Sequence, residues 1–167
     1  MLKKTILCLA LILIVTSCIP FPHIYRTAPK VDGVVLNNGE PVRNTVLHLN
    51  SRTGLCNSEG SIKTVTDENG RFSFGPIWNF GLITFFIGDP IYGWSLSVDR
   101  DSKEVPIAQE GGLGILRGGT RKIICRLDKL PEKEGLNNED LYFRTRLFKE
   151  NTEAICILME EDRSTEK

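Results

Sequence analysis

The stretch TVTDENGRFSF, residues 64–74, decides how this chain folds, and it ends in an alternating run. Phe72 and Phe74 alternate with the polar residues Arg71 and Ser73. Successive side chains of a β-strand point to opposite faces, so both aromatic rings belong to the same face. We therefore predict a strand here, with Phe72 and Phe74 in the core of a β-sheet protein.

A tight turn comes directly before this run. Asn69 and Gly70 are residue types that accept the positive φ angles of such a turn, and the Asp67 carboxylate is placed to accept hydrogen bonds from its amides. The alternative is a calcium loop formed by Asp67, Glu68 and Asn69. That loop would need further oxygen ligands at alternating positions, which the sequence lacks. We therefore interpret Asp67, Asn69 and Gly70 as a structural turn and predict no metal site.

Short β-rich runs continue on both sides of this stretch, separated by Gly, Asn and Pro residues. No long helical pattern occurs before Pro131. Seven short strands separated by turn residues are typical of a β-sandwich. We predict an all-β fold with strands at 31–36, 45–51, 62–66, 71–74, 83–87, 95–99 and 121–127.

Three segments together carry a resemblance to a known module. They are VDGVV at 31–35, GEPVRNTV at 39–46 and the opening stretch at 64–74. In this combination the chain resembles the carboxypeptidase regulatory-like domains, which are transthyretin-like (prealbumin-like) β-sandwiches. The resemblance covers residues 31–128 and implies a seven-stranded sandwich of that type.

The resemblance also implies a role without catalysis, because such domains stabilise the proteins that carry them or bind partners. The zinc-binding H-x-x-E motif of the parent carboxypeptidases is absent from this sequence. A purine-pathway hydrolase of related fold relies on clustered histidines and an arginine, whereas this chain has only His23 and His48. We therefore expect no enzyme activity and no cofactor.

The first eighteen residues have the pattern of an export signal. Lys3 and Lys4 precede an apolar run at 6–15 that is shorter than the roughly twenty residues of a membrane-spanning helix. The run ends in Val-Thr-Ser-Cys at 15–18, which resembles the lipobox of bacterial lipoproteins. That resemblance implies removal of residues 1–17 and lipidation of Cys18 as a membrane anchor. An ordinary secretory signal cut nearby is the alternative.

An anchored chain is expected in the cell envelope. If the host has two membranes, the absence of Asp after Cys18 looks like the sorting signal for an outer-membrane lipoprotein that faces the periplasm. Prolines and the lack of apolar periodicity predict an extended, poorly ordered tether over 18–30, ahead of the sandwich.

Residues 129–167 are expected to lie outside the sandwich as a polar connector and a small C-terminal extension. Two apolar-leaning runs, 142–148 and 154–159, predict an added hairpin, although the residues at 138–140 could equally cap a short helix. The last residues, 160–167, are almost wholly polar and are expected to fray.

Charge and cysteine content limit the chemistry of the chain. With 21 basic and 21 acidic residues, the sequence has no basic footprint for nucleic acid. Three cysteines remain in the exported part, namely Cys56, Cys125 and Cys156. They lack the C-x-x-C spacing of a metal site, so we predict one disulfide among them, with Cys125 as the favoured member because it lies on an apolar strand.

An aromatic segment at 77–94 contains both tryptophans of the chain. A core strand buries only alternate positions, so some of these side chains must cover the sandwich edge or lie exposed. We keep three interpretations open, namely a lid over the core, a partner-binding surface and contact with lipid beside Cys18. The candidate partner-binding residues are Trp78, Phe86, Tyr92 and Trp94.

Two further features receive structural interpretations. His48 lies between Leu47 and Leu49, so its ring should point away from the core as a surface histidine. The glycines at 111–119 lack the lysine and the strand-to-helix context of a phosphate loop, so we expect a flexible connection.

These patterns predict a lipid-anchored, non-catalytic envelope protein that binds another protein. An immunity or inhibitor protein that meets a secreted toxin or an envelope enzyme is one form of this hypothesis. A structural or accessory component of an envelope assembly is the other form. A hydrolase would need a buried constellation of titratable groups that the sequence does not display.

Overall fold

The computed structural model describes residues 23–54, 59–81, 91–114, 116, 118–130, 145–147 and 154–162. These residues form an all-β fold, as predicted, with one short 3₁₀ helix, η1 (Leu127–Lys129). No helix among them is long and apolar enough to span a membrane. The strands are β1 (His23–Ala28), β2 (Lys30–Asn37), β3 (Glu40–Pro41), β4 (Val46–Thr53), β5 (Glu59–Val65), β6 (Arg71–Phe74), β7 (Ile77–Gly81), β8 (Ile91–Arg100), β9 (Lys103–Leu113), β10 (Thr120–Arg126) and β11 (Cys156–Asp162).

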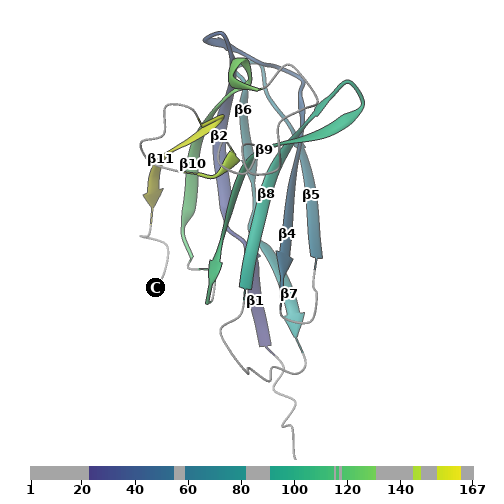
Figure 1. Ribbon diagram of the computed structural model, residues 1–167, viewed down its shortest axis with the longest axis vertical. Helices are drawn as coiled ribbons and strands as arrows, with labels where there is room; N and C mark the ends of the chain where they lie inside the picture. The colour runs from purple at the N-terminus through teal and green to yellow at the C-terminus, as the bar shows by residue number, and fades with distance from the viewer. Residues whose placement is uncertain are drawn as a thin grey trace, which may run out of the picture.

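The strands form three sheets (Figure 1). In the five-stranded sheet, β2 pairs in parallel with β10 and antiparallel with β3 and β6, while β11 pairs antiparallel with β10. The four-stranded sheet has the order β5-β4-β8-β9 and is antiparallel throughout. Strands β1 and β7 form a separate two-stranded ribbon.

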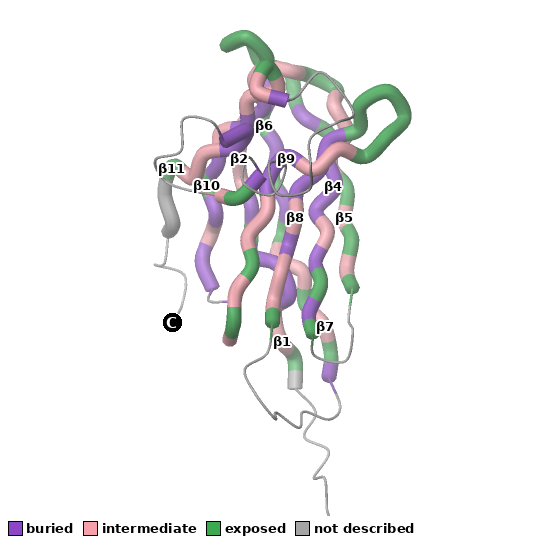
Figure 2. Tube along the Cα trace, viewed as in Figure 1, coloured by how far each residue is buried: buried purple, intermediate pink, exposed green. Residues whose placement is uncertain are grey.

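One hydrophobic core lies between the five-stranded and four-stranded sheets (Figure 2). It takes Val31 and Val35 from one sheet and Leu47, Leu49 and Leu96 from the other, all fully buried. Phe72 and Phe74 lie in this core, and their rings contact edge to face with centroids 5.9 Å apart. Burial of such aliphatic and aromatic surface is the main favourable term in folding.

The turn before β6 has the predicted hydrogen bonds. Asp67 Oδ1 accepts from the backbone N–H groups of Asn69 and Arg71, each at 2.8 Å. Gly70 has a φ of +70°, and a Cβ at this position would lie 2.6 Å from the carbonyl oxygen of Val35. This turn carries the chain from β5 in one sheet to β6 in the other.

Residues 23–28 correct the predicted tether. They form β1, which pairs with β7, and the β1–β7 ribbon continues the β2–β6 pair past Pro29 and Pro76. Prolines cannot donate to a ladder, so the pairing is interrupted there and resumes beyond them. The proline content predicted an unpaired chain. However, a proline that lies between two strands, such as Pro29, leaves both strands free to pair. Cys18 lies outside the described residues.

The C-terminal part corrects a second boundary. Strand β11 belongs to the five-stranded sheet as the neighbour of β10, so the prediction that the chain frays from residue 160 is wrong for residues 160–162. Residues 163–167 lie outside the described residues. Its described partner is β10 rather than the run at 142–148. Cys125 and Cys156 lie directly opposite each other in this pair and form a disulfide. Cys56 lies outside the described residues.

Strand β9 was not predicted from the sequence. We expected Gly111 and Gly112 in a flexible loop, but they belong to β9, because they pair with Gly93 and Tyr92 of β8. Glycine has low strand propensity, and pairing with the neighbouring strand outweighs that preference here. The predicted strand at 83–87 lies outside the described residues.

Candidate functional site

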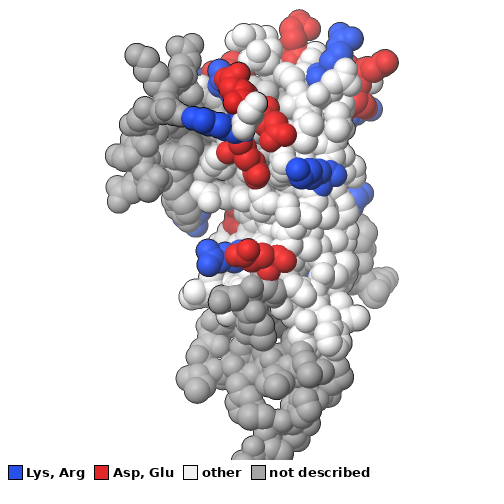
Figure 3. Space-filling model, turned by 90° about the vertical axis from the view of Figure 1, so that its right-hand side faces the viewer, with Lys and Arg blue, Asp and Glu red and all other residues white. Residues whose placement is uncertain are grey.

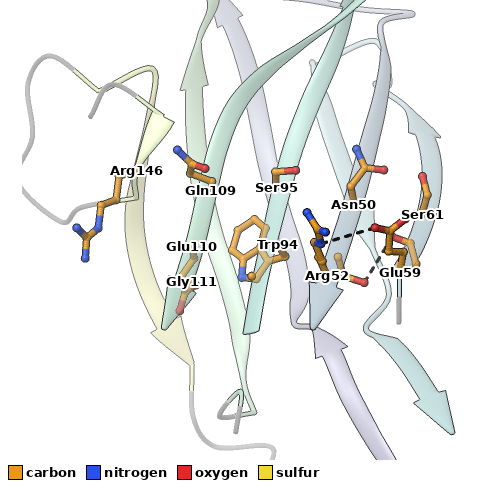
Figure 4. Close-up of a pocket in the computed structure, with 13 residues that line it drawn as sticks. Asn50, Arg52, Glu59, Ser61, Trp94, Ser95, Gln109, Glu110, Gly111 and Arg146 are labelled. Carbon is orange, nitrogen blue, oxygen red and sulfur yellow. Dashed lines mark hydrogen bonds and ion pairs between the residues drawn. The ribbon is translucent and has the colours of Figure 1, made fainter. Parts of the chain in front are cut away.

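An open groove of about 600 Å³ crosses the outer face of the four-stranded sheet (Figure 4). All four strands of this sheet contribute to it, together with a segment at 145–147. The lining residues are Asn50, Ser51, Arg52, Glu59, Gly60, Ser61, Gly93, Trp94, Ser95, Gln109, Glu110, Gly111 and Arg146.

Two rows of paired residues form the floor. One row across the sheet is Ser61, Asn50, Ser95 and Gln109, and the next is Glu59, Arg52, Gly93 and Gly111. The rows are two residues apart on every strand, so all eight residues face the same side. That side faces away from the core, because the intervening residues of β4 and β8 include the buried Ser51 and Trp94.

The two rows differ in chemistry. The first presents hydroxyl and carboxamide groups, which both donate and accept hydrogen bonds. The second combines two glycines with the ion pair between Arg52 Nε and Glu59 Oε1, 3.7 Å apart. Both partners of this pair are largely exposed, so it contributes little to stability and is available to rearrange. Figure 3 shows basic and acidic side chains exposed together on one face of the molecule.

Gly93 is not required by the local packing. A Cβ at this position would have its nearest contacts at 3.9 Å and 4.0 Å, which is ordinary van der Waals distance. Gly111 is more restricted, because a Cβ there would lie 3.1 Å from the carbonyl oxygen of Tyr92. The glycine at 93 therefore keeps the groove open without being needed to let the strands pair.

The segment at 145–147 forms the wall beside β9. Leu147 N donates to the carbonyl oxygen of Gln109 at 3.1 Å, and the Gln109 carboxamide donates to Thr145 Oγ1 at 2.6 Å. These two bonds place Arg146 at the rim, where its guanidinium extends away from the sheet (Figure 4). The groove is therefore built partly from a segment that the sequence assigned to the extension.

A polar network follows the groove along β4. Asn50 Nδ2 donates to Glu104 Oε1 at 2.6 Å. His48 Nε2 lies 2.8 Å from Asp99 Oδ1, and its Nδ1 lies 3.7 Å from Glu104 Oε2. His48 points away from the core as predicted, but it is buried rather than exposed, because these two carboxylates cover the ring.

Behind the groove, a buried ion pair joins the two large sheets. Arg121 of β10 donates through Nε and a terminal nitrogen to the two carboxylate oxygens of Glu110, both at 2.9 Å. Arg121 is almost completely buried, so its charge needs the two hydrogen bonds to Glu110. Loss of Glu110 would leave a buried charge without a partner carboxylate.

The residues predicted to bind a partner differ in burial where the structure describes them. Trp94 is only 3% exposed and packs in the core, so its ring offers no surface to a partner, which corrects that prediction. Its indole N–H has no hydrogen-bond partner among the described residues. Tyr92 is half-buried against the core, Trp78 is exposed on β7, and Phe86 lies outside the described residues.

The turn residues do not contribute to the groove. Asp67, Asn69 and Gly70 connect β5 to β6, whereas the groove is lined by the other end of β5. Sequence reasoning missed the groove because the residues of its floor are either small or polar, and none forms a recognisable motif. The one available signal was the alternation of Gly93 and Ser95 with large apolar residues in β8.

The groove can recognise a ligand by hydrogen bonding and charge. Its side chains offer hydroxyl, carboxamide, guanidinium and carboxylate groups. Within the part of the chain that the structure describes, no group of three or more His, Cys, Asp or Glu residues could hold a metal ion.

No protein-family model matches the sequence, and neither does any curated protein. Among solved structures, a 9R-lipoxygenase from Cyanothece PCC8801 is similar at 18% sequence identity with a TM-score of 0.31. The similarity covers 61% of this chain and 17% of the lipoxygenase chain.

Proposed function

We propose that the protein is a lipid-anchored, non-catalytic envelope protein that binds a segment of another protein in the groove. The observation that carries this proposal is the pair of residue rows on the groove floor. One row is rich in hydrogen-bonding groups, and in the other Gly93 and Gly111 have no side chains that would fill the groove. Glycine in a strand is a common sign that another backbone approaches closely.

The groups in the groove suit a polypeptide ligand. A peptide presents alternating N–H and C=O groups, and Asn50, Gln109, Ser61 and Ser95 can donate to or accept from either. Arg146 adds a positive charge at the rim, and Arg52 adds a guanidinium in an exposed ion pair with Glu59. Arginine is enriched in protein interfaces. An open groove also admits a chain that enters and leaves, which an enclosed cavity does not.

The sequence supports the other parts of the proposal. The resemblance of residues 15–18 to a lipobox is the reason for placing the anchor at Cys18. The resemblance of residues 31–128 to carboxypeptidase regulatory-like domains, and through them to transthyretin-like sandwiches, is the reason for a non-catalytic binding role. The motif turn at 67–70 joins the two large sheets, which is consistent with a sandwich built around it.

The test of groove binding is a variant that fills the floor. Gly93→Val would add a β-branched side chain where the backbone has room, and valine favours strands, so we expect the fold to persist. Partner recovered after cross-linking in intact cells should fall about tenfold or more. Gly75→Val is the matched control, because position 75 has open space and lies outside the groove.

Equal recovery of the partner by the wild-type, Gly93→Val and Gly75→Val proteins would contradict groove binding. The identity of the recovered partner then separates the two forms of the hypothesis, a toxin or envelope enzyme on one side and a structural subunit on the other. The anchor is tested independently with Cys18→Ser, which should release the protein into the soluble envelope fraction. Retention in membranes after an alkaline wash would place the anchor elsewhere.

A further inference from the structure

The β1–β7 ribbon carries an exposed apolar face. Ile24 is 70% exposed, Trp78 53% and Phe80 61%. Ile24 lies directly opposite Phe80 in the ladder, and Arg26 lies opposite Trp78. Residues opposite each other, and residues two apart on one strand, share a face, so these four side chains lie together. The Arg26 guanidinium stacks over the Trp78 ring, 4.7 Å from its centroid.

The other face of the ribbon is held against the sandwich. Thr27 Oγ1 lies 2.9 Å from Ser51 Oγ of β4 and donates to the carbonyl oxygen of Ile77 at 3.4 Å. Ile77 also lies so close to Gly60 of β5 that a Cβ there would be 2.7 Å from its Cγ2 atom. These contacts set the orientation of the ribbon. Its apolar face must therefore point outward.

The position of the ribbon limits what can cover that face. The ribbon lies at the end of the molecule where the chain enters the fold, in the lower part of Figure 1. Strand β1 begins at His23, only five residues after Cys18. Five extended residues reach at most about 18 Å. If Cys18 is lipidated, as the proposed function states, the ribbon cannot lie far from the bilayer surface.

We propose that Ile24, Trp78 and Phe80 insert into the membrane–water interface beside the anchor, with Arg26 at the level of the lipid phosphates. Tryptophan favours this interface because its ring is apolar and its N–H is polar. Arginine extends its charged end to the headgroups while its stem stays apolar. The ribbon supplies a second membrane contact that sets how the anchored domain stands on the surface. This inference rests on the lipid anchor of the proposed function.

The two tryptophans allow a direct measurement. Trp78 is exposed on the ribbon and Trp94 is buried in the core, and they are the only tryptophans of the chain. The purified lipidated protein is placed in vesicles of phosphatidylethanolamine and phosphatidylglycerol that contain brominated lipids. In Trp94→Phe, where Trp78 is the sole tryptophan, we expect strong quenching. In Trp78→Phe, where Trp94 is the sole tryptophan, we expect little.

If Trp94→Phe fails to fold, the contribution of Trp78 is the difference between the wild-type protein and Trp78→Phe. Equal, weak quenching in all three proteins would overturn the inference. A Trp78 covered by a partner protein in the cell, rather than by lipid, gives this same result, because the purified protein brings no partner to the vesicles.

A second arm uses Cys18→Ser, which removes the anchor and leaves the ribbon as the membrane contact. On this background Phe80→Ser should weaken binding to the same vesicles about fivefold to tenfold. Val65→Ser is the matched control, because Val65 is similarly exposed but lies at the far end of β5. Equal loss in both variants would overturn the inference.

The two proposals fail separately. A wild-type protein that lacks lipid at Cys18 contradicts the proposed anchor. A lipidated protein whose Trp78 is not quenched leaves the anchor in place and contradicts only the ribbon contact.

Discussion

Strands β6 and β7 follow each other in the chain and have the same pattern, yet the structure treats them in opposite ways. In RFSF of β6, Phe72 and Phe74 are 6% and 2% exposed. In IWNFG of β7, Trp78 and Phe80 are 53% and 61% exposed. Both strands place two aromatic residues at alternate positions. Their alternation is therefore not what distinguishes them.

The difference comes from what lies opposite each strand. Strand β6 pairs with β2 inside the five-stranded sheet, so its aromatic face meets the four-stranded sheet across the core. Strand β7 pairs with β1 beyond Pro29 and Pro76, and its aromatic face has no sheet opposite it among the described residues. Alternation specifies which side chains share a face, and only the packing decides whether that face is covered.

The strongest test of this comparison replaces each aromatic residue of the two strands by alanine in turn. Phe72→Ala and Phe74→Ala should each lower the free energy of unfolding by about 3 to 5 kcal/mol, because each opens a cavity in the core. Trp78→Ala and Phe80→Ala should lower it by less than about 1 kcal/mol, because solvent already contacts these rings. Urea denaturation of the four variants measures both effects. Similar losses in the two pairs would break the comparison.

The disulfide tests whether a strand at the sheet edge needs a covalent link. Strand β11 is an edge strand, and Cys125–Cys156 closes a loop with a sequence separation of 31 residues. Replacing both cysteines by alanine should cost about 3 to 4 kcal/mol on the chain-entropy model. Thermal unfolding with and without reductant is the measurement, and the double variant should be insensitive to reductant. A reductant-sensitive melt in that variant would mean that another bridge stabilises the fold.

The smallest expected effect separates backbone strain from close contact at two turns. Gly70 and Gly39 both have positive φ, at +70° and +85°. A Cβ at 70 would collide with the backbone of Val35, whereas a Cβ at 39 would meet nothing within 4 Å. Gly70→Ala should cost about 1 to 3 kcal/mol and Gly39→Ala about 1 kcal/mol. Equal melting temperatures for the two variants would show that strain alone accounts for the loss.

Much of the sandwich could be predicted because its signals are local. The turn at 67–70 and the shared face of Phe72 and Phe74 follow from short patterns whose physics acts within a few residues. Cys125 was favoured as a member of the disulfide because it lies on an apolar strand, which is also a local signal. Strands β1 and β9 were not predicted, and the part of β11 within the run at 154–159 was predicted as a strand but with the run at 142–148 as its partner. Proline, glycine and charged residues lower the local preference of these segments for strands, and pairing with β7, β8 and β10 overrides it.

The candidate groove was harder to predict from the sequence, because it combines residues from four strands and a separate segment. Asn50, Ser61, Ser95 and Gln109 become one row only through the register of three strand pairs. None of them is unusual in its own stretch of sequence. The aromatic segment at 77–94 drew attention instead, yet among its described residues only Gly93 and Trp94 line the groove.

By itself, the sequence determined the all-β class, the alternation within β6, and the turn that joins β5 to β6, because these depend on residue types a few positions apart. Only the tertiary structure decided that Trp94 is buried while Trp78 is exposed, that β1 shortens the connection to Cys18, and that small residues on four strands leave a groove. The physical reason is that burial and register depend on strands far apart in the chain. The sequence of one strand does not say which other strand pairs with it or packs over it.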